Sequence, residues 1–284
     1  MIKKILIANR GEIACRIIRA CHEMSIEAVA VYSEVDSFSP HVLMADEAVE
    51  IGPANPSESY LNFQKIVDAA KSTNSDAIHP GYGFLSENGD FAQFVRDSNL
   101  IFIGPDSETI KSMGDKAQSK IMMAKAGVPT IPGNDGELTG NIDSIAKDIG
   151  YPLMVKAAAG GGGKGMRVVY NPDELESALD SAKTEARNSF GDDTIILEKF
   201  LDSPRHIEVQ ILGDNHGNIV HLFERECSIQ RRHQKIVEES PSPAINKKLR
   251  REMGEAAIKA AKATNYSNAG TVEFLFQDGN FYFL

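Results

Sequence analysis

Apolar and polar positions alternate in blocks along the first 113 residues. Four apolar runs have the length of buried strands: residues 2–8, 26–33, 100–104 and the run that ends at Ile78. Three amphipathic stretches separate them, around residues 12–24, 60–72 and 89–98. In the first, positions such as Ile13, Ile17 and Met24 share one helical face. This alternation predicts a doubly wound parallel α/β sheet for residues 1–113.

The pattern changes after a helix predicted at Asp115–Ala126, which Asp115 and Gly127 would cap. Residues 128–136, rich in Pro and Gly, predict a linker. Strands are then expected at 152–158, 166–170, 194–199, 207–212, 218–223, 271–276 and 280–284, with helices at 172–188 and 247–264. Consecutive strands favour antiparallel hairpins, so residues 114–284 are expected to form an α+β domain. Because the chain ends inside the apolar run FYFL, we expect a fragment.

Composition narrows the class of protein. The 284 residues are 42% hydrophobic and 25% charged, which excludes disordered, collagen-like and disulfide-scaffold proteins. No run approaches the ~20 consecutive apolar residues of a membrane span, and no signal-peptide core is visible, so we expect a cytoplasmic protein. A net charge of −10 argues against nucleic-acid backbone as a partner. Cys15, Cys21 and Cys227 are expected to be reduced core residues.

A run of glycines follows the strand predicted at 152–158. Lys156 lies on that strand, and Gly160, Gly161, Gly162 and Gly163 come after it. Consecutive glycines let backbone N–H groups close over an anion, so the segment predicts a phosphate-binding loop, with a plain hairpin tip as the alternative. It lacks the Gly-Lys-Ser/Thr ending of a Walker-type loop. The first strand-to-helix turn holds one glycine where a dinucleotide fingerprint needs three, which argues against an NAD enzyme.

Three further features carry candidate chemistry. Residues 79–88, HPGYGFLSEN, follow a predicted parallel strand, and open α/β sheets bind ligands at that end. Residues 225–235 are strongly basic, but glutamates flank them on both sides, which favours an internal ion-paired site over a nucleic-acid surface. Glu273 lies between apolar neighbours of a predicted strand and therefore needs a cation. We predict a Mg²⁺ ligand, with an ion pair to a basic side chain as the alternative.

Segments along the whole chain together resemble biotin carboxylase, the ATP-grasp component of biotin-dependent carboxylases. They are KILIANRGEIA (4–14), ADEAVEIG (45–52), HPGYGFLSEN (79–88), FIGP (102–105), MGDK (113–116), GGGGKGMR (160–167), EKF (198–200), PRHIE (204–208), ERECSIQRRHQK (224–235) and GTVEFLF (270–276). The resemblance implies a Rossmann-like, pre-ATP-grasp domain over residues 1–113. It also implies an ATP-grasp domain over 114–284 that is incomplete at its C-terminus, with a mobile glycine-rich lid at about 130–200.

The resemblance further implies roles for individual residues. Lys116 and Lys156 would contact the ATP phosphates, and Gly160–Gly163 would close over them. The adenine pocket would be lined by Glu198, Lys199 and Leu201, and the nucleotide would also face His206, Gln230 and His233. Lys235 would hold bicarbonate as the catalytic residue, Glu273 would bind Mg²⁺ or Mn²⁺, and Tyr82 would lie on the biotin side.

The implied reaction is ATP-dependent carboxylation of biotin by bicarbonate through carboxyphosphate, giving carboxybiotin, ADP and phosphate. The implied partners are a biotin carboxyl carrier, a carboxyltransferase and a second copy in a homodimer. The family's second metal glutamate and its catalytic arginine and glutamate follow the last strand and are not among these 284 residues, so the chain alone is expected to be inactive. Two alternatives stay open: another ATP-grasp ligase, such as a carbamoyl-phosphate synthetase or a purine-pathway carboxylase, and a nucleotide-binding module without catalysis.

Overall fold

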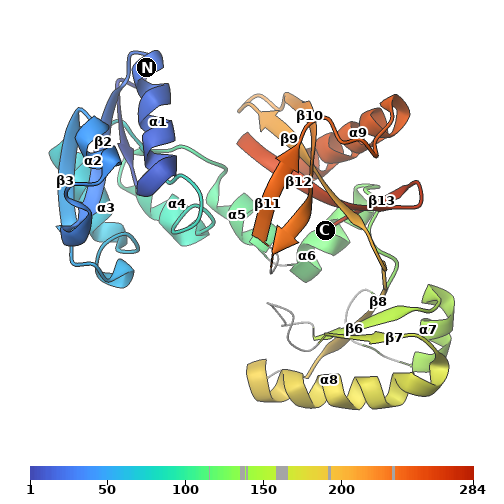
Figure 1. The fold of residues 1–284 in the computed structure, drawn as a ribbon. Helices are drawn as coiled ribbons and strands as arrows, with labels where there is room; N and C mark the ends of the chain where they lie inside the picture. Colours follow the sequence, from blue (N-terminus) through green and yellow to red (C-terminus); the bar gives the residue numbers. More distant parts are fainter. Residues whose placement is uncertain (115, 135–137, 139, 158–165, 191–192, 232–233) are drawn as a thin grey trace. The chain divides into compact units, whose positions relative to one another are not determined.

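The computed structural model describes all residues except 115, 135–137, 139, 158–165, 191–192 and 232–233. Its internal contacts divide the chain into two units (Figure 1). The first unit contains residues 1–114 with the short segments 213–217 and 264–269. The second contains 115–212, 218–263 and 270–284. Each unit has its own sheets and is described by itself.

The first unit is built on a parallel sheet whose strand order is β3-β2-β1-β4-β5. The strands are β1 (Lys4–Ile7), β2 (Glu27–Ser33), β3 (Glu47–Gly52), β4 (Ala77–His79) and β5 (Ile101–Phe102). The chain extends the sheet to one side of β1 through β2 and β3, and to the other side through β4 and β5. This reversal is the doubly wound topology that the sequence predicts.

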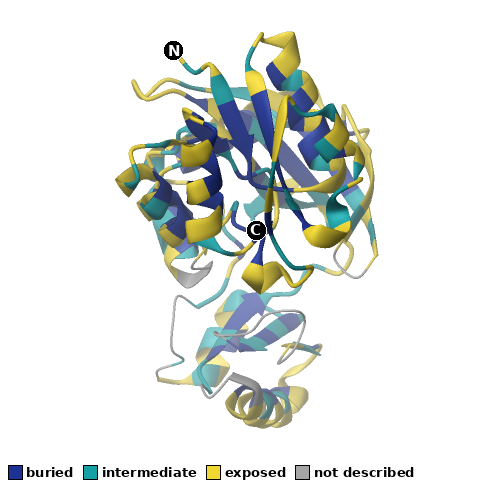
Figure 2. Ribbon diagram, turned by 90° about the vertical axis from the view of Figure 1, so that its left-hand side faces the viewer, coloured by how far each residue is buried: buried dark blue, intermediate teal, exposed yellow. Residues whose placement is uncertain are grey.

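Helices cover both faces of this sheet because successive strand residues point to opposite sides. Ile5 and Ile7 of β1 pack with Ile17 and Ile18 of α1 (Gly11–Glu23). Leu6 packs on the other face with buried residues of α3 (Phe63–Ser72) and α4 (Gly89–Asp97). Figure 2 shows the buried strands between the half-exposed helices. The remaining helical segments of this unit are Glu34–Asp36, α2 (Pro40–Met44), Pro56–Glu58 and α5 (Ser107–Gly114).

The predicted ligand loop after β4 is held by a buried asparagine. The Asn9 amide donates to the carbonyls of Pro80 and Tyr82, each at 2.8 Å. Gly81 has a φ of +68°, and a Cβ there would lie 2.7 Å from Asn9 Nδ2, so a glycine is required. The Gly81 N–H donates to His79 Nδ1 at 3.0 Å. The carboxyl end of the sheet therefore carries a fixed loop.

The second unit contains two sheets. The smaller has the order β7-β6-β8, with β6 (Leu153–Ala157) antiparallel to both β7 (Met166–Val169) and β8 (Ile195–Lys199). Helix α8 (Leu175–Phe190) packs along this sheet through Leu175, Leu179 and Ala182 (Figure 1). α7 (Ile142–Ile149) contributes Ala146 to the same core. Residues 172–174 form a short helical turn before α8, and α6 (Lys116–Lys125) opens the unit.

The larger sheet has the order β11-β10-β9-β12-β13. Its strands are β9 (Arg205–Gly213), β10 (Ile219–Arg231), β11 (Gln234–Glu239), β12 (Asn268–Gln277) and β13 (Asn280–Phe283). Helix α9 (Lys247–Ala263) packs against β10. The contact is fixed by the Arg250 guanidinium, which donates to both oxygens of the buried Glu224 at 2.5–3.0 Å. Glu224 thus marks the face of β10 that α9 covers.

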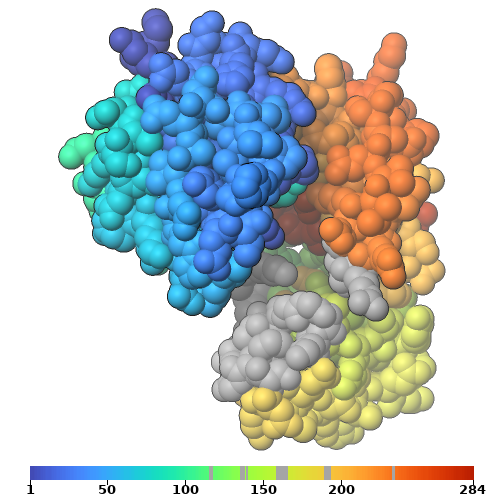
Figure 3. Space-filling model, turned by 60° about the vertical axis from the view of Figure 1, so that its left-hand side comes forward, coloured from blue at the N-terminus to red at the C-terminus, as the bar shows by residue number. Residues whose placement is uncertain are grey.

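The predicted fold class, an α/β unit followed by an α+β unit, is confirmed, and several segments need correction. Strands β3 and β11 were not predicted, because both lie at sheet edges, and half of the β3 residues and most of the β11 residues are exposed. The orange part of the chain in Figure 3, which includes β11, reaches the molecular surface. The predicted linker is not a free connection: Pro129 and Pro132 accept backbone bonds of 2.7 Å from Phe283 and Lys199.

The expected core position of the three cysteines is confirmed. Cys15, Cys21 and Cys227 are free and buried. No helix in the described part of the chain combines the length and the apolar character needed to cross a bilayer. The boundary at residues 113 and 114 and the lid at about 130–200 stay predictions.

We predict that acid destabilises the first unit through His79. Burial lowers the pKa of His79 to about 4, so the folded chain holds it neutral while the unfolded chain protonates it below about 6.5. Its contribution to stability is present above pH 6.5 and is lost as the pH falls toward 4. Between pH 7 and pH 5 this costs about 2 kcal/mol of the free energy of unfolding. Urea denaturation at both pH values measures the loss.

The matched variant is His79→Asn, whose side-chain oxygen can still accept the Gly81 N–H but does not titrate. Its free energy of unfolding should depend on pH less steeply than that of the parent chain by this amount. Equal slopes in the two proteins would contradict the prediction.

Candidate functional site

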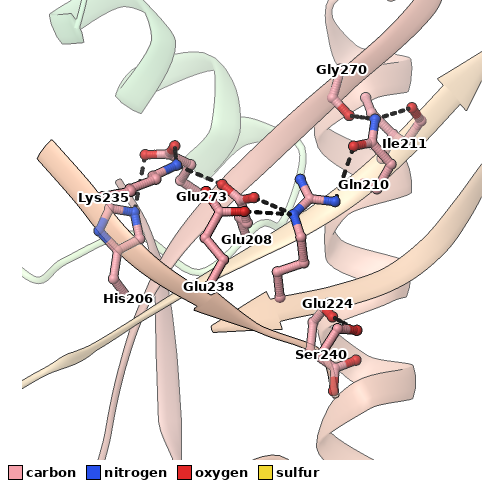
Figure 4. Close-up of polar contacts among 11 residues, drawn as sticks. His206, Glu208, Gln210, Ile211, Glu224, Lys235, Glu238, Ser240, Gly270 and Glu273 are labelled. Atoms are coloured by element: carbon pink, nitrogen blue, oxygen red, sulfur yellow. Dashed lines mark hydrogen bonds and ion pairs between the residues drawn. The ribbon is translucent and has the colours of Figure 1, made fainter. Parts of the chain in front are cut away.

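Strand alternation collects polar side chains on one face of the larger sheet. On β9, Ile207, Val209 and Ile211 are buried in the core, whereas His206, Glu208 and Gln210 point to the other face. Glu273 on β12 lies between the buried Val272 and Phe274 in the same manner. On β10, Glu224 faces α9, so its neighbour Arg225 lies on the polar face. Figure 4 shows His206, Glu208 and Glu273 close together on this face.

Lys235, on β11, lies between two carboxylates. Its ammonium group contacts Glu208 Oε2 at 2.5 Å and also pairs with Glu273 Oε1 (Figure 4). Burial opposes the charge of Lys235, but the hydrogen bonds to Glu208 and Glu273 raise its pKa above its ordinary value. The hydrogen bond from His206, together with Lys235, lowers the pKa of Glu273 to about 2. We call Lys235, Glu208, Glu273 and His206 the Lys235 cluster.

His206 is oriented by Gln230 of β10. The Gln230 amide nitrogen donates to the Cys227 carbonyl at 2.9 Å and lies 2.7 Å from His206 Nδ1. An amide nitrogen only donates, so Nδ1 is the acceptor and Nε2 carries the ring proton. Nε2 therefore donates to Glu273 Oε2 at 3.0 Å. One N–H of the imidazole is thus directed at the carboxylate.

A second ion-paired group surrounds Glu198 on β8. Its carboxylate is buried and pairs with Lys120 of α6 at 3.1 Å and with Lys156 of β6. Burial by itself would raise the pKa of Glu198, but Lys156 and Lys120 outweigh it and hold the pKa below its ordinary value. Lys156 retains more solvent exposure than Lys120. One carboxylate thus serves two lysines, and the more exposed lysine can reach a ligand.

The other predicted site residues fall into two groups. Lys199 donates to the carbonyls of Gly150 and Tyr151 at 3.0 and 2.7 Å, directly after α7, and Leu201 is half-buried. Tyr82 belongs to the first unit, is exposed and donates to Glu12. Gly160–Gly163 and His233 lie outside the described residues, as does the side chain of Lys116. The roles implied for all of these residues stay predictions.

No individual role was predicted for three side chains that contact the Lys235 cluster or Glu198. They are Glu208, Arg225 and Lys120. Glu208 lies two residues after His206 on the same strand, so strand alternation could have placed it on the polar face. Arg225 could have been found in the same way, opposite Glu224. Lys120 follows Lys116 by one helical turn. This spacing within the helix does not predict an ion pair between Lys120 and a residue of β8.

The Lys235 cluster is suited to a small anion. Lys235 offers a cation whose partners are themselves held in place, and His206 offers an N–H. Among the described residues, no group of three or more His, Cys, Asp or Glu side chains is arranged to hold a metal ion. A single carboxylate such as Glu273 still fits Mg²⁺, which commonly takes one or two carboxylates and completes its shell with phosphate and water. Glu273 already makes the ion pair that the sequence left as the alternative.

Family models match nearly the whole chain. Residues 1–110 match the model described as "Biotin carboxylase, N-terminal domain". Residues 115–284 match "Carbamoyl-phosphate synthase L chain, ATP binding domain". The boundary between the two matches falls where the contacts divide the chain.

Named relatives agree with these models. The chain is 56% identical to biotin carboxylase from Nostoc sp., covering 99% of this chain and 64% of that protein. It is also 56% identical to the mitochondrial methylcrotonoyl-CoA carboxylase subunit alpha from Rattus norvegicus, covering 100% of this chain and 40% of the relative. The chain therefore spans less than two thirds of the length of either relative.

One solved structure shows the likeness in three dimensions. It is the biotin carboxylase domain dimer of Hydrogenobacter thermophilus 2-oxoglutarate carboxylase, in complex with MgADP, ADP and bicarbonate. The two share 51% sequence identity with a TM-score of 0.85, over 100% of this chain and 63% of that chain.

We predict that Glu198 stabilises the smaller sheet through its two lysines. Glu198→Gln keeps the shape of the side chain but leaves Lys120 and Lys156 without their counter-charge. Removing one partner from a largely buried ion pair is expected to cost about 2 kcal/mol of unfolding free energy here. Urea denaturation measures it.

Glu185→Gln is the matched control, because its pair with Arg167 is a third or more exposed at both ends. Such a surface pair should contribute less than about 1 kcal/mol. Equal losses in the two variants would show that the Glu198 pairs are no stronger than a surface contact.

Proposed function

This chain belongs to the biotin carboxylase family, and on that premise we propose that it forms the nucleotide- and bicarbonate-binding part of an enzyme that carboxylates biotin. The observation that carries the proposal is Lys235, held between Glu208 and Glu273 beside the N–H of His206. The match of residues 1–110 to the biotin carboxylase N-terminal model favours this function over other ATP-grasp ligases and over a module without catalysis.

The residues fit the charges of the reaction. A bicarbonate oxygen attacks the γ-phosphorus of ATP, the bond to the bridging oxygen breaks, and ADP leaves. The carboxyphosphate formed then yields phosphate and CO₂, which biotin takes up on a ureido nitrogen as that nitrogen loses its proton. Phosphoryl transfer depends mainly on positioning and charge stabilisation. Lys235 would hold bicarbonate, and Lys156 would contact a nucleotide phosphate while Lys120 keeps Glu198 neutralised.

A divalent cation has a place in this proposal. Mg²⁺ would neutralise charge that develops on the phosphates. Glu273 would supply one ligand, since a pKa of about 2 keeps it ionised at neutral pH. A manganese ion would suit the same oxygen donor.

The relatives also suggest partners for the whole protein. The structure of the Hydrogenobacter thermophilus domain is a dimer, and the rat relative is a subunit of a larger carboxylase. We propose that the whole protein likewise forms a homodimer and works with a biotin carrier and a carboxyltransferase. Equal identity to the methylcrotonoyl-CoA carboxylase subunit and to a biotin carboxylase favours no particular acyl acceptor.

We predict that Lys235→Gln abolishes most bicarbonate use. In the whole protein that contains these residues, ADP release from MgATP should depend on bicarbonate and free biotin. Losing a charge-assisted contact to the anion should lower kcat/KM for bicarbonate about 10- to 100-fold, with the KM for ATP nearly unchanged. A coupled ADP assay measures both constants. If the parent protein released ADP at the same rate without bicarbonate, the proposed function would be wrong.

The 284 residues taken alone are a separate test. They cover 64% of the Nostoc biotin carboxylase, so we predict no bicarbonate-dependent ADP release from them, while the whole protein is active in the same assay. Carboxybiotin formation by the 284-residue chain would show that this part contains the complete catalytic machinery.

A further inference from the structure

Arg225 is linked to Lys235 through a shared carboxylate. The guanidinium Nε pairs with Glu208 Oε1, while Lys235 contacts Glu208 Oε2 at 2.5 Å (Figure 4). Glu208 is almost completely buried, with 5% of its side chain exposed. Its two oxygens therefore each have one cationic partner. Burial would raise the pKa of Glu208, but Lys235 and Arg225 hold it below the ordinary value.

The guanidinium is itself fixed from a second side. Arg225 Nη1 donates to Gln210 Oε1 at 3.2 Å, and Gln210 Nε2 donates to the Gly270 carbonyl of β12 at 2.7 Å. The bond to the backbone of β12 fixes the Gln210 side chain, and this fixes the position of the oxygen that accepts from Arg225. Glu238 lies 3.8 Å from Arg225 Nε and is 46% exposed, so it is a rim contact.

The charges of the site depend on Arg225. With Arg225 present, the two cations Arg225 and Lys235 face the two buried or half-buried carboxylates, Glu208 and Glu273. Without Arg225, Lys235 would face both carboxylates by itself. Lys235, Glu208 and Glu273 together would then carry an uncompensated negative charge. An arriving anion would then have to compete with Glu208 as well as Glu273 for one ammonium group.

We propose that Arg225 is a positioning residue that neutralises Glu208 and so keeps the charge of Lys235 available to bicarbonate. The inference rests on the proposed function and adds to it a residue that touches neither substrate. Arg225 and Gln210 would thus affect the binding of bicarbonate, whereas the group around Glu198 would affect the binding of the nucleotide.

The test is Arg225→Gln in the whole protein, with KM measured separately for bicarbonate and for ATP. Loss of one nearby positive charge should raise the bicarbonate KM about 10-fold and leave the ATP KM within about twofold. Arg225→Lys restores the charge and should recover most of the bicarbonate affinity. Glu238→Gln is the matched control on the exposed side of the same guanidinium and should change neither constant by more than about twofold.

An unchanged bicarbonate KM in Arg225→Gln, with an active parent protein, would overturn the inference and leave the proposed function standing. Equal increases in both KM values would also overturn it, since they indicate general distortion of the site. If Arg225→Gln does not fold, Gln210→Leu removes the clamp alone and should raise only the bicarbonate KM, about threefold. No effect there would likewise overturn the inference. A parent protein without bicarbonate dependence would overturn both proposals.

Discussion

The burial of Glu208 is the constraint on which the site depends. A carboxylate this far from water is stable only when its charge is paired and its oxygens are hydrogen-bonded, and here the sheet supplies a cation to each oxygen, from β10 and β11. Lys235 is drawn into the same arrangement and brings Glu273 with it. The positions of four neighbouring strands, β11, β10, β9 and β12, are thereby tied to one buried charge. Removing any member leaves an uncompensated charge and not merely a lost contact.

The two ion-paired groups of the second unit follow the same physical scheme with the signs exchanged. Glu198 is one carboxylate between two lysines, whereas Lys235 is one lysine between two carboxylates. If an anion takes Lys156, Glu198 keeps Lys120. If an anion takes Lys235, Glu208 keeps Arg225. This lowers the electrostatic cost of exchanging a protein contact for a substrate contact. Sharing of charge prepares both groups to bind anions.

Sequence patterns predict the parts of this protein that bury apolar surface. The core strands and the long helices follow directly from spacing, because β1, β9 and α1 each present a continuous apolar face. The apolar pattern did not predict strands β3 and β11, because an edge strand can carry polar residues on both faces. Family resemblance named His206, Lys235 and Glu273, which the structure brings together. The contacts of Glu208 with Arg225 and Lys235 needed the strand pairing, since a sequence pattern places a residue on one face of its strand but does not say which strands lie side by side.

The placement of Lys235 on an edge strand has a mechanical consequence. β11 lies at an edge of the sheet, where the described residues pair it with β10, and this pairing contains register shifts between Glu226 and Gln230. Glu208, His206 and Glu273 lie instead on the inner strands β9 and β12. In the proposed function, the side chain that turns from protein carboxylates toward an incoming anion is thus carried by an edge strand. The carboxylates and the imidazole that define where it returns are held by strands paired on both sides.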